Sequence, residues 1–304
     1  MKHSFFSDKK YWFKGNTHAH TTRTDGTCPP DKQVQDYIER GYDFLAITDH
    51  NVVDSYQEKK GICMLPGWER DVRHNEENTS CIHVIGLFPA DACSMQVKEK
   101  PRYACNEVTD QELLDEMRED GEFVILAHPH WSRMLPEEVT KLDGFQAIEV
   151  FNAGCECLMH AGRADLYWDM LLQEGKRIYG IACDDTHGKT EKSDRFAGWI
   201  MVHEDECTAH SIIEAMTRGD FYATQGPEIL DWGRDGNEVY FECSPCAEVH
   251  FITYPTRGTS IFAKDGEVLT KVRYTLKGGE KYVRVECIDE KGKSGWTNPF
   301  FFNN

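Results

Sequence analysis

The chain has 304 residues, which is too long for one small domain and suits a large α/β domain with or without a small appendage. Hydrophobic residues make up 40% and charged residues 28%, a composition typical of a globular protein with a buried core. The formal net charge of -18 disfavours general binding to nucleic-acid phosphates, and the sequence has no apolar run of the ~18 residues that a membrane-spanning helix needs.

Through the first two thirds of the chain, short apolar runs alternate with segments of helical periodicity. The apolar runs are expected to form buried strands over 43–48, 81–87, 123–127, 147–151 and 177–182. Helices are expected over 31–40, 109–118 and 163–174, and the second opens with Thr109 and Glu112 at the spacing of a capping box. This alternation predicts parallel strands joined by helices, in an α/β layer or barrel.

The character of the sequence changes near Gly226-Pro227, after which helical periodicity is lost. Polar and apolar residues then predict strands over 238–243, 248–253, 271–275 and 281–287. We therefore predict two domains, an α/β domain over 1–228 and a small antiparallel β-sandwich-like domain over 229–304. The second contains no cluster of histidines and carboxylates, so we expect it to supply packing rather than chemistry.

Twelve cysteines are spread through the chain without the regular spacing of a disulfide framework. Because the segment 1–7 lacks the long apolar core of a signal peptide, we expect a cytoplasmic protein with free thiols. Cys243-Ser-Pro-Cys246 has the spacing of half a zinc ribbon, but no second pair completes four ligands, and Cys155-Glu-Cys157 is likewise unpartnered. We favour ordinary buried cysteines over a metal site in both places.

Histidines and carboxylates gather where the predicted strands end. His18 and His20 are two residues apart, which places them on one face of an extended chain. Further residues of these types follow at, or lie within, the next strands: Asp25, His50, Glu69, His83, His128, Asp185 and His187. A lone histidine is most simply a structural residue, but strand ends of α/β barrels converge on one face, where imidazole and carboxylate suit zinc, manganese or iron. The pattern therefore predicts a metal site, with Asp49 orienting a ligand rather than binding the metal.

These motifs resemble, in order and spacing, those of the PHP (polymerase and histidinol phosphatase) superfamily over about residues 12–226. The matching motifs are His18-x-His20, Asp25, Thr48-Asp-His50, Glu69, His83, Ala127-His128-Pro and Asp185-x-His187. The resemblance implies a distorted (β/α)7 barrel with a trinuclear centre that holds three divalent ions of manganese, iron or zinc. Many members have a histidine where this chain has Asp25.

The same resemblance assigns the ligands to three ions. The first would be held by His18, His20, Glu69 and Asp185; the second by Glu69 as a bridge, with His83 and His128; the third by Asp25, His50 and His187. Three carboxylates and three divalent ions leave about +3 in the cleft of an acidic protein, which favours a compact dianion such as a phosphate monoester.

We therefore predict a metal-dependent phosphoric monoester or diester hydrolase, in which a metal-bound hydroxide attacks a small phosphorylated metabolite. His130 and Asp185 are the candidate catalytic residues, and His130 could protonate the leaving group. Arg163, Lys189 and Arg195 are candidates for binding the substrate phosphate, although surface ion pairs are the usual role of such arginines.

Two alternatives remain open at this stage. The same chemistry could hydrolyse another ester, such as a lactone, because an activated hydroxide can also attack a carbonyl carbon. The chain could instead be a non-catalytic binding module that a metal stabilises. A nucleic-acid polymer is disfavoured as a partner by the acidic charge, and no membrane partner is expected. The sequence does not define the oligomeric state.

Overall fold

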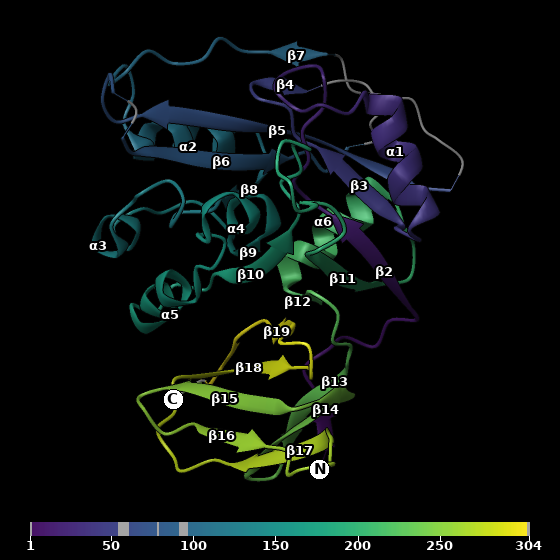
Figure 1. Ribbon diagram of the computed structural model, residues 1–304. Coiled ribbons are helices and arrows are strands. Elements are labelled where there is room, and N and C mark those ends of the chain that lie inside the picture. The colour runs from purple at the N-terminus through teal and green to yellow at the C-terminus, as the bar shows by residue number, and fades with distance from the viewer. Residues whose placement is uncertain (1, 54–60, 78, 91–96, 303–304) are drawn as a thin grey trace.

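A computed structural model describes residues 2–53, 61–77, 79–90 and 97–302 (Figure 1). The helices are α1 (Pro30–Glu39), α2 (Asp110–Glu119), α3 (Pro136–Val139), α4 (Ala153–Met159), α5 (Asp165–Gln173) and α6 (Ala209–Arg218). The strands up to residue 228 are β1 (Lys2–Ser4), β2 (Tyr11–Asn16), β3 (Phe44–Ile47), β4 (Val52–Val53), β5 (Cys63–Arg73), β6 (Cys81–Leu87), β7 (Lys98–Glu99), β8 (Phe123–Leu126), β9 (Ala147–Asn152), β10 (Tyr179–Cys183), β11 (Trp199–Glu204) and β12 (Phe221–Thr224). The strands that follow are β13 (Ile229–Asp235), β14 (Glu238–Cys246), β15 (Glu248–Tyr254), β16 (Thr259–Phe262), β17 (Leu269–Thr275), β18 (Tyr282–Ile288), β19 (Ser294–Thr297) and β20 (Phe300–Phe301).

Most of the strands join one large mixed sheet, in the order β10-β9-β8-β6-β5-β3-β2-β11-β12-β19-β18-β15-β16. Strands β2, β3 and β5 run parallel to one another, as do β8, β9 and β10. Strand β6 is antiparallel to both β5 and β8, and β11 is antiparallel to both β2 and β12. The mixed α/β class is as predicted, whereas the parallel arrangement holds only within these two groups.

The antiparallel direction of β6 follows from the short connection before it. Only residues 74–80 separate β5 from β6, whereas a parallel crossover needs about a dozen residues or more. Strands β10 and β2 do not pair directly, and a bridge between Ala19 and Thr186 joins the loops that follow them. The predicted (β/α)7 barrel is therefore not confirmed, since the part of the chain that the structure describes contains no closed barrel.

The helices form close to the positions that their end signals predict. Helix α1 begins at Pro30, and α2 begins after Thr109. The Thr109 hydroxyl accepts a hydrogen bond from the Glu112 amide (3.2 Å), and the Glu112 carboxylate accepts one from the Thr109 amide (2.7 Å), which completes the predicted capping box. Helix α5 begins two residues later than predicted, and α3, α4 and α6 lie outside the predicted helices.

Beyond residue 228 the described residues form antiparallel strands, in agreement with the alternating sequence pattern. One small sheet has the order β1-β13-β14-β17 and includes the N-terminal strand, whose pairing no sequence signal predicts. Strands β19, β18, β15 and β16 instead extend the large sheet beyond β12. The two-domain division at residue 228 stays a prediction, and strand pairing runs across it.

The hydrophobic cores follow this arrangement. The larger core lies around the large sheet and includes Trp68, Trp168 and Trp296, all fully buried. The smaller core includes Phe241 of β14 and Val285 of β18, so it lies between the two sheets of the C-terminal part (Figure 1). Trp296 belongs to β19, and the C-terminal segment therefore completes the larger core. None of the helices in the described ranges is long and apolar enough to cross a membrane.

Candidate metal centre

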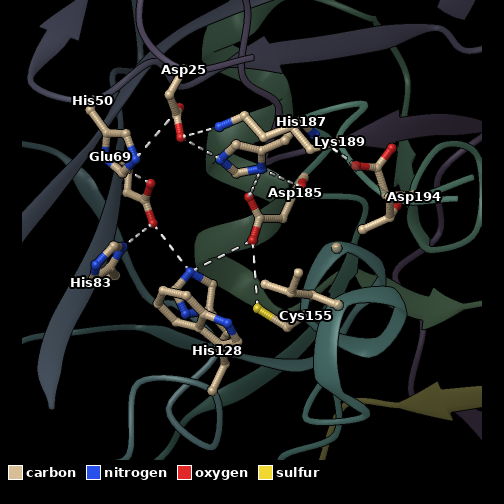
Figure 2. Close-up of a pocket in the computed structure, with 14 residues that line it drawn as sticks. Asp25, His50, Glu69, His83, His128, Cys155, Asp185, His187, Lys189 and Asp194 are labelled. Atoms are coloured by element: carbon tan, nitrogen blue, oxygen red, sulfur yellow. Dashed lines mark hydrogen bonds and ion pairs between the residues drawn. The ribbon is translucent and has the colours of Figure 1, made fainter. Parts of the chain in front are cut away.

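The histidines and carboxylates that the sequence places at strand ends come together around one cavity (Figure 2). His18 and His20 follow β2, and His50 follows β3. Glu69 of β5 pairs with Ile85, and His83 of β6 pairs with Asp71, so Glu69 and His83 lie diagonally across the two paired strands. The remaining members follow β8 and β10: His128, Asp185 and His187. Strand order thus brings residues from most of the length of the α/β part into one centre.

Glu69 lies at the middle of this centre and is almost fully buried. Its Oε1 atom is 2.7 Å from His83 Nδ1, 3.2 Å from His128 Nε2 and 3.6 Å from His18 Nε2. Its Oε2 atom is 3.2 Å from His20 Nε2 and 3.1 Å from His50 Nδ1. The two oxygens therefore face two different groups of imidazoles.

Asp185, in the loop after β10, contacts three of the same imidazoles. Its Oδ1 atom is 3.2 Å from Nε2 of both His18 and His20, and its Oδ2 atom is 3.7 Å from His128 Nε2. Asp185 has a φ of 49° and His128 a φ of 24°, in a region that non-glycine residues seldom occupy. Such strain concentrates at functional sites, where surrounding structure holds a side chain in a required position.

Asp25 closes the outer side of the centre. Its Oδ2 atom is 3.1 Å from His187 Nε2 and 3.0 Å from Lys189 Nζ, and its Oδ1 atom is 3.6 Å from His20 Nδ1 and 3.8 Å from His50 Nε2. The Asp25 side chain is 42% exposed, so this carboxylate lies at the mouth of the cavity.

Several polar atoms of this centre are not paired in hydrogen bonds with one another. His18 Nε2 and His20 Nε2 lie 3.0 Å apart, so two ring nitrogens point at the same place. Three buried atoms lack a hydrogen-bond partner within the described structure: His20 Nδ1, His50 Nδ1 and Asp185 Oδ1. Buried polar atoms in folded proteins are normally paired, so this arrangement indicates lone pairs directed at something else. The donor set fits divalent metal ions, since imidazole and carboxylate are their usual ligands.

The ionisation of the centre shows how strongly its groups depend on one another. Burial would raise the pKa of Glu69, but the neighbouring His50 and His83 hold it well below its usual range. Burial would lower the pKa of His20, but the nearby carboxylates of Asp185 and Glu69 raise it to about 9. His50 is different, because burial dominates there and lowers its pKa to about 4. The carboxylates are thus held ionised, and their negative charge is available to cations.

Glu149, which the sequence analysis did not single out, orients two of the histidines. Its fully buried carboxylate is 2.7 Å from His18 Nδ1 and accepts hydrogen bonds from the His128 amide (3.0 Å) and the Asn152 side chain (2.8 Å). A carboxylate that holds the second nitrogen of a ligating imidazole fixes both the tautomer and the orientation of the ring. The one available signal is a glutamate inside an otherwise apolar run, on β9.

Two aspartates organise the loops that carry the ligands. Asp49 accepts hydrogen bonds from the Thr21 amide (2.9 Å), the Thr21 hydroxyl (2.6 Å) and the Thr24 hydroxyl (2.6 Å), so it holds the loop after His20, and its role in orienting a ligand stays a prediction. Asp194 accepts bonds from the amides of His187 (2.8 Å) and Gly188 (2.9 Å). Asp194 is buried and is also a residue that the sequence analysis missed.

The cavity has a volume of about 210 Å³ and two chemically different sides. Trp131 and Leu158 form an apolar wall beside the histidines, whereas Lys189 and Thr190 line the side near Asp25. Of the candidates for substrate contact, Lys189 therefore lies at the cavity, as its sequence position near His187 suggests.

The other three candidates are placed differently. Arg163 pairs with Asp165 (2.8 Å) and Glu286 (2.7 Å), which agrees with the ordinary ion-pair alternative. Arg195 pairs with Asp36 at 2.8 Å. Neither arginine is among the residues that line the cavity, and neither is His130, although its neighbour Trp131 is.

Comparisons with known proteins add the following. No protein-family model matches the chain, and no curated protein sequence matches it. Among solved structures, it is similar to a two-domain protein from Bacteroides vulgatus containing a predicted PHP-like metal-dependent phosphoesterase, with a TM-score of 0.49 and 15% identity over 98% of this chain and 97% of that one.

Two shorter structures are similar to part of the chain. One is a putative metal-dependent phosphoesterase from Bifidobacterium adolescentis, with a TM-score of 0.44 and 16% identity over 67% of this chain and 96% of that one. The other is an amidohydrolase from Chromobacterium violaceum with bound sulfate, with a TM-score of 0.43 and 15% identity over 67% and 96%. The first structure and the Bifidobacterium one carry descriptions of the class that the sequence motifs resemble. At these identities and TM-scores we draw no function from them.

Proposed function

We propose that this chain is a metal-dependent phosphoesterase that hydrolyses a small phosphorylated metabolite. The observation that carries the proposal is a buried set of imidazoles and carboxylates that converges on one cavity with donor atoms left unpaired. The cavity volume of about 210 Å³ suits the phosphoryl end of a small ester. Three divalent ions of manganese, iron or zinc are the proposed cofactors.

Glu69 is the proposed bridge between the first two ions. Its Oε1 atom lies nearest His83 and His128 of the second group and is also 3.6 Å from His18 of the first, whereas its Oε2 atom lies nearest His20 of the first group and His50 of the third. His18, His20 and Asp185 complete the first group, within 3.2 Å of one another. The geometry supports a bridging carboxylate, because one oxygen is available to each ion.

The third proposed ion lies at the mouth of the cavity. Asp25, His50 and His187 are its ligands, and their ligand atoms lie within 4.8 Å of one another together with that of His20. Because Asp25 is 42% exposed, this group is the most accessible to solvent and to a chelator.

Bound divalent cations supply positive charge that polarises a phosphoric ester and lowers the pKa of water. The chain itself positions the ester: Lys189 can donate a hydrogen bond to a phosphate oxygen, since its amine lies at the cavity beside Asp25. Trp131 and Leu158 provide an apolar surface for the organic part of the substrate. Asp185 is the proposed catalytic carboxylate beside the first ion. His130 does not line the cavity, so its role as donor of a proton to the leaving oxygen stays a prediction that requires its side chain to reach the substrate.

The test is metal analysis of protein purified without chelator, followed by assays on an aryl phosphate, a phosphodiester and a lactone. We expect phosphate release that a chelator abolishes and added manganese, iron or zinc restores, with competitive inhibition by inorganic phosphate. Efficient cleavage of lactones with every phosphorylated compound left intact would replace the phosphoesterase by another esterase. Bound metal without hydrolysis of any ester would support the non-catalytic module.

A further inference from the structure

Three cysteines outside the metal centre lie in the hydrophobic core of the C-terminal part. Cys243 and Cys246 belong to β14, and Cys287 belongs to β18. Their exposed fractions are 2%, 0% and 0%, and all three are members of the smaller hydrophobic core. The two strands belong to different sheets, so the three thiols lie where one sheet faces the other.

A bulge in β14 directs both of its cysteines inward. The register with β17 shifts between Glu242 and Cys246, and Ser244-Pro245 occupies the extra length. Residues of a regular strand that are three apart point to opposite faces, whereas an inserted residue restores them to the same face. Pro245 is exposed and Cys243 and Cys246 are buried on either side of it.

The three side chains interact with one another. Each thiol has the other two among the groups that influence its ionisation, and all three lie in one buried core between two sheets. The Cys243 thiol also donates a hydrogen bond to the Leu269 carbonyl (3.6 Å). One buried cysteine is an ordinary small apolar residue, but three neighbouring sulfurs form a set of soft ligands.

We propose that Cys243, Cys246 and Cys287 form a binding site for one thiophilic d10 cation, either zinc or copper(I). Soft thiolates select these ions, whereas the imidazoles and carboxylates of the other centre do not provide sulfur. The two sites are independent, so this inference does not rest on the proposed hydrolase activity. The third ligand also completes the Cys243-x-x-Cys246 pair, for which the sequence offers no second pair.

Binding of the cation balances protons and charge. The S–H bonds of the three cysteines lose their protons to solvent and sulfur–metal bonds form, which leaves a charge of about -1 for zinc with three thiolates.

Such a site would tie the two sheets together. Because β14 and β18 are held otherwise by apolar contacts, a shared cation would link segments that are distant in sequence. Binding free energy is then added to the free energy of unfolding, so the bound ion raises the thermal midpoint.

The experiment uses the full-length protein, reduced with a thiol-free reductant, and two probes. Cadmium(II) represents the divalent ion and copper(I), supplied from a competing chelator, represents the monovalent one. We expect one equivalent of thiolate-to-metal ultraviolet absorption per chain with at least one probe. The probe that survives competition at the lower free-ion concentration identifies the ion. Cys243→Ser, Cys246→Ser and Cys287→Ser should each abolish that absorption, and Cys105→Ser, in a loop away from the cluster, should keep it.

The wild-type measurement alone can overturn the site, even if a variant does not fold. Absence of sulfur-dependent absorption with both probes, or its persistence in Cys246→Ser, would exclude a cation on these three thiols. A thiol count that is two lower before reduction, mapped to this cluster, would show a disulfide instead. In the supported case, the bound ion raises the thermal midpoint of the wild type and of Cys105→Ser by more than that of Cys246→Ser, which keeps only the His/carboxylate centre.

Discussion

The metal centre and the C-terminal β part bury their carboxylates in opposite ways. In the C-terminal part, Glu280 accepts hydrogen bonds from the Tyr274 hydroxyl (2.8 Å) and the Lys277 amide (2.7 Å), so its Oε1 atom has two donors. At the centre, Asp185 Oδ1 is buried and close to two imidazoles, yet it has no hydrogen-bond partner. His20 Nδ1 and His50 Nδ1 are in the same situation.

This difference distinguishes buried polar groups that stabilise the fold from buried polar groups that are free to bind a ligand. A buried polar group with good partners contributes to folding, whereas one without partners costs about 1–3 kcal/mol. A fold that accumulates several such groups in one place does so for a function. The comparison therefore predicts that substitutions at the centre change metal content and activity, and that those in the β part change stability.

The largest effect is expected for Glu69→Gln. Both oxygens of Glu69 face separate imidazole groups, so loss of the charge weakens two ions together. Activity should fall at least ~10³-fold, about 4 kcal/mol in barrier height, with two ions lost per chain. Metal analysis and steady-state kinetics measure both.

Glu149→Gln is the matched control for that variant. Glu149 is equally buried and contacts His18, but it is not a proposed ligand. It should lose only ~10–100-fold in metal affinity or activity, as residues that orient ligands do. Full metal occupancy in Glu69→Gln would contradict the bridging role.

Trp296→Ala tests the prediction that substitutions in the C-terminal β part change stability. This C-terminal tryptophan is fully buried in the larger core, where its ring stacks near Phe151 and its Nε1 donates to Asp165 at 3.2 Å. We expect the free energy of unfolding to fall by ~3–4 kcal/mol, measured by denaturant titration. Phe262→Ala, at a side chain that is 62% exposed, should change it by less than ~0.5 kcal/mol. A Trp296→Ala protein as stable as the parent would contradict the packing role of the segment.

Much of the centre could be predicted because its residues lie at strand ends. The apolar runs mark the strands, and a histidine or carboxylate after a run is visible in the sequence, as for His128 and Asp185. Glu149 could not be assigned in this way, since a position inside a strand does not show which face its side chain occupies. The meeting of Cys287 with Cys246 also depends on how two sheets pack, which no local pattern contains.

The mixed α/β class of the fold could be predicted from the sequence, but the predicted closure of the strands into a barrel was not confirmed. Strand β5 contains Pro66, Gly67 and three consecutive charged residues, so its sequence is not typical of a buried strand. Tertiary contacts bury it nevertheless, because Glu69 faces the imidazoles and Asp71 pairs with Arg102 (2.9 Å). The antiparallel pairing of β5 with β6 then replaces the parallel crossover that a regular barrel requires.

A smaller effect is expected for Asp25→Asn. Asp25 lies at the mouth of the cavity and shares no contact with the bridging oxygens of Glu69. We expect loss of one ion, retention of the other two and a ~10²-fold fall in activity, seen in the same assays. Asp265→Asn, in an exposed turn of the β part, is the control. Three retained ions would show that Asp25 is not a ligand, and unchanged turnover would show that the third ion is dispensable.

The smallest effect concerns Glu122, a buried carboxyl outside the metal centre. Glu122 is 4% exposed, its Oε2 accepts a hydrogen bond from Trp68 Nε1 (2.9 Å), and its Oε1 has no partner in the described structure. Burial raises its pKa to about 7, whereas the neighbouring imidazoles lower that of Glu69. The contrast illustrates that burial raises the pKa of a carboxyl, whereas nearby imidazoles lower it.

Since the folded-state pKa of Glu122 is raised above its unfolded value of 4.5, its contribution to stability is present below pH 4.5 and is lost as the pH rises through about 7. We therefore expect the stability of the parent to fall between pH 5 and pH 8 by up to ~2–3 kcal/mol relative to Glu122→Gln, which cannot ionise. Denaturant titrations of both proteins at several pH values measure this difference, with Glu119→Gln, at the exposed end of α2, as the control. A parent and a Glu122→Gln variant with parallel pH profiles would show that Glu122 is ionised in the fold and would contradict this prediction.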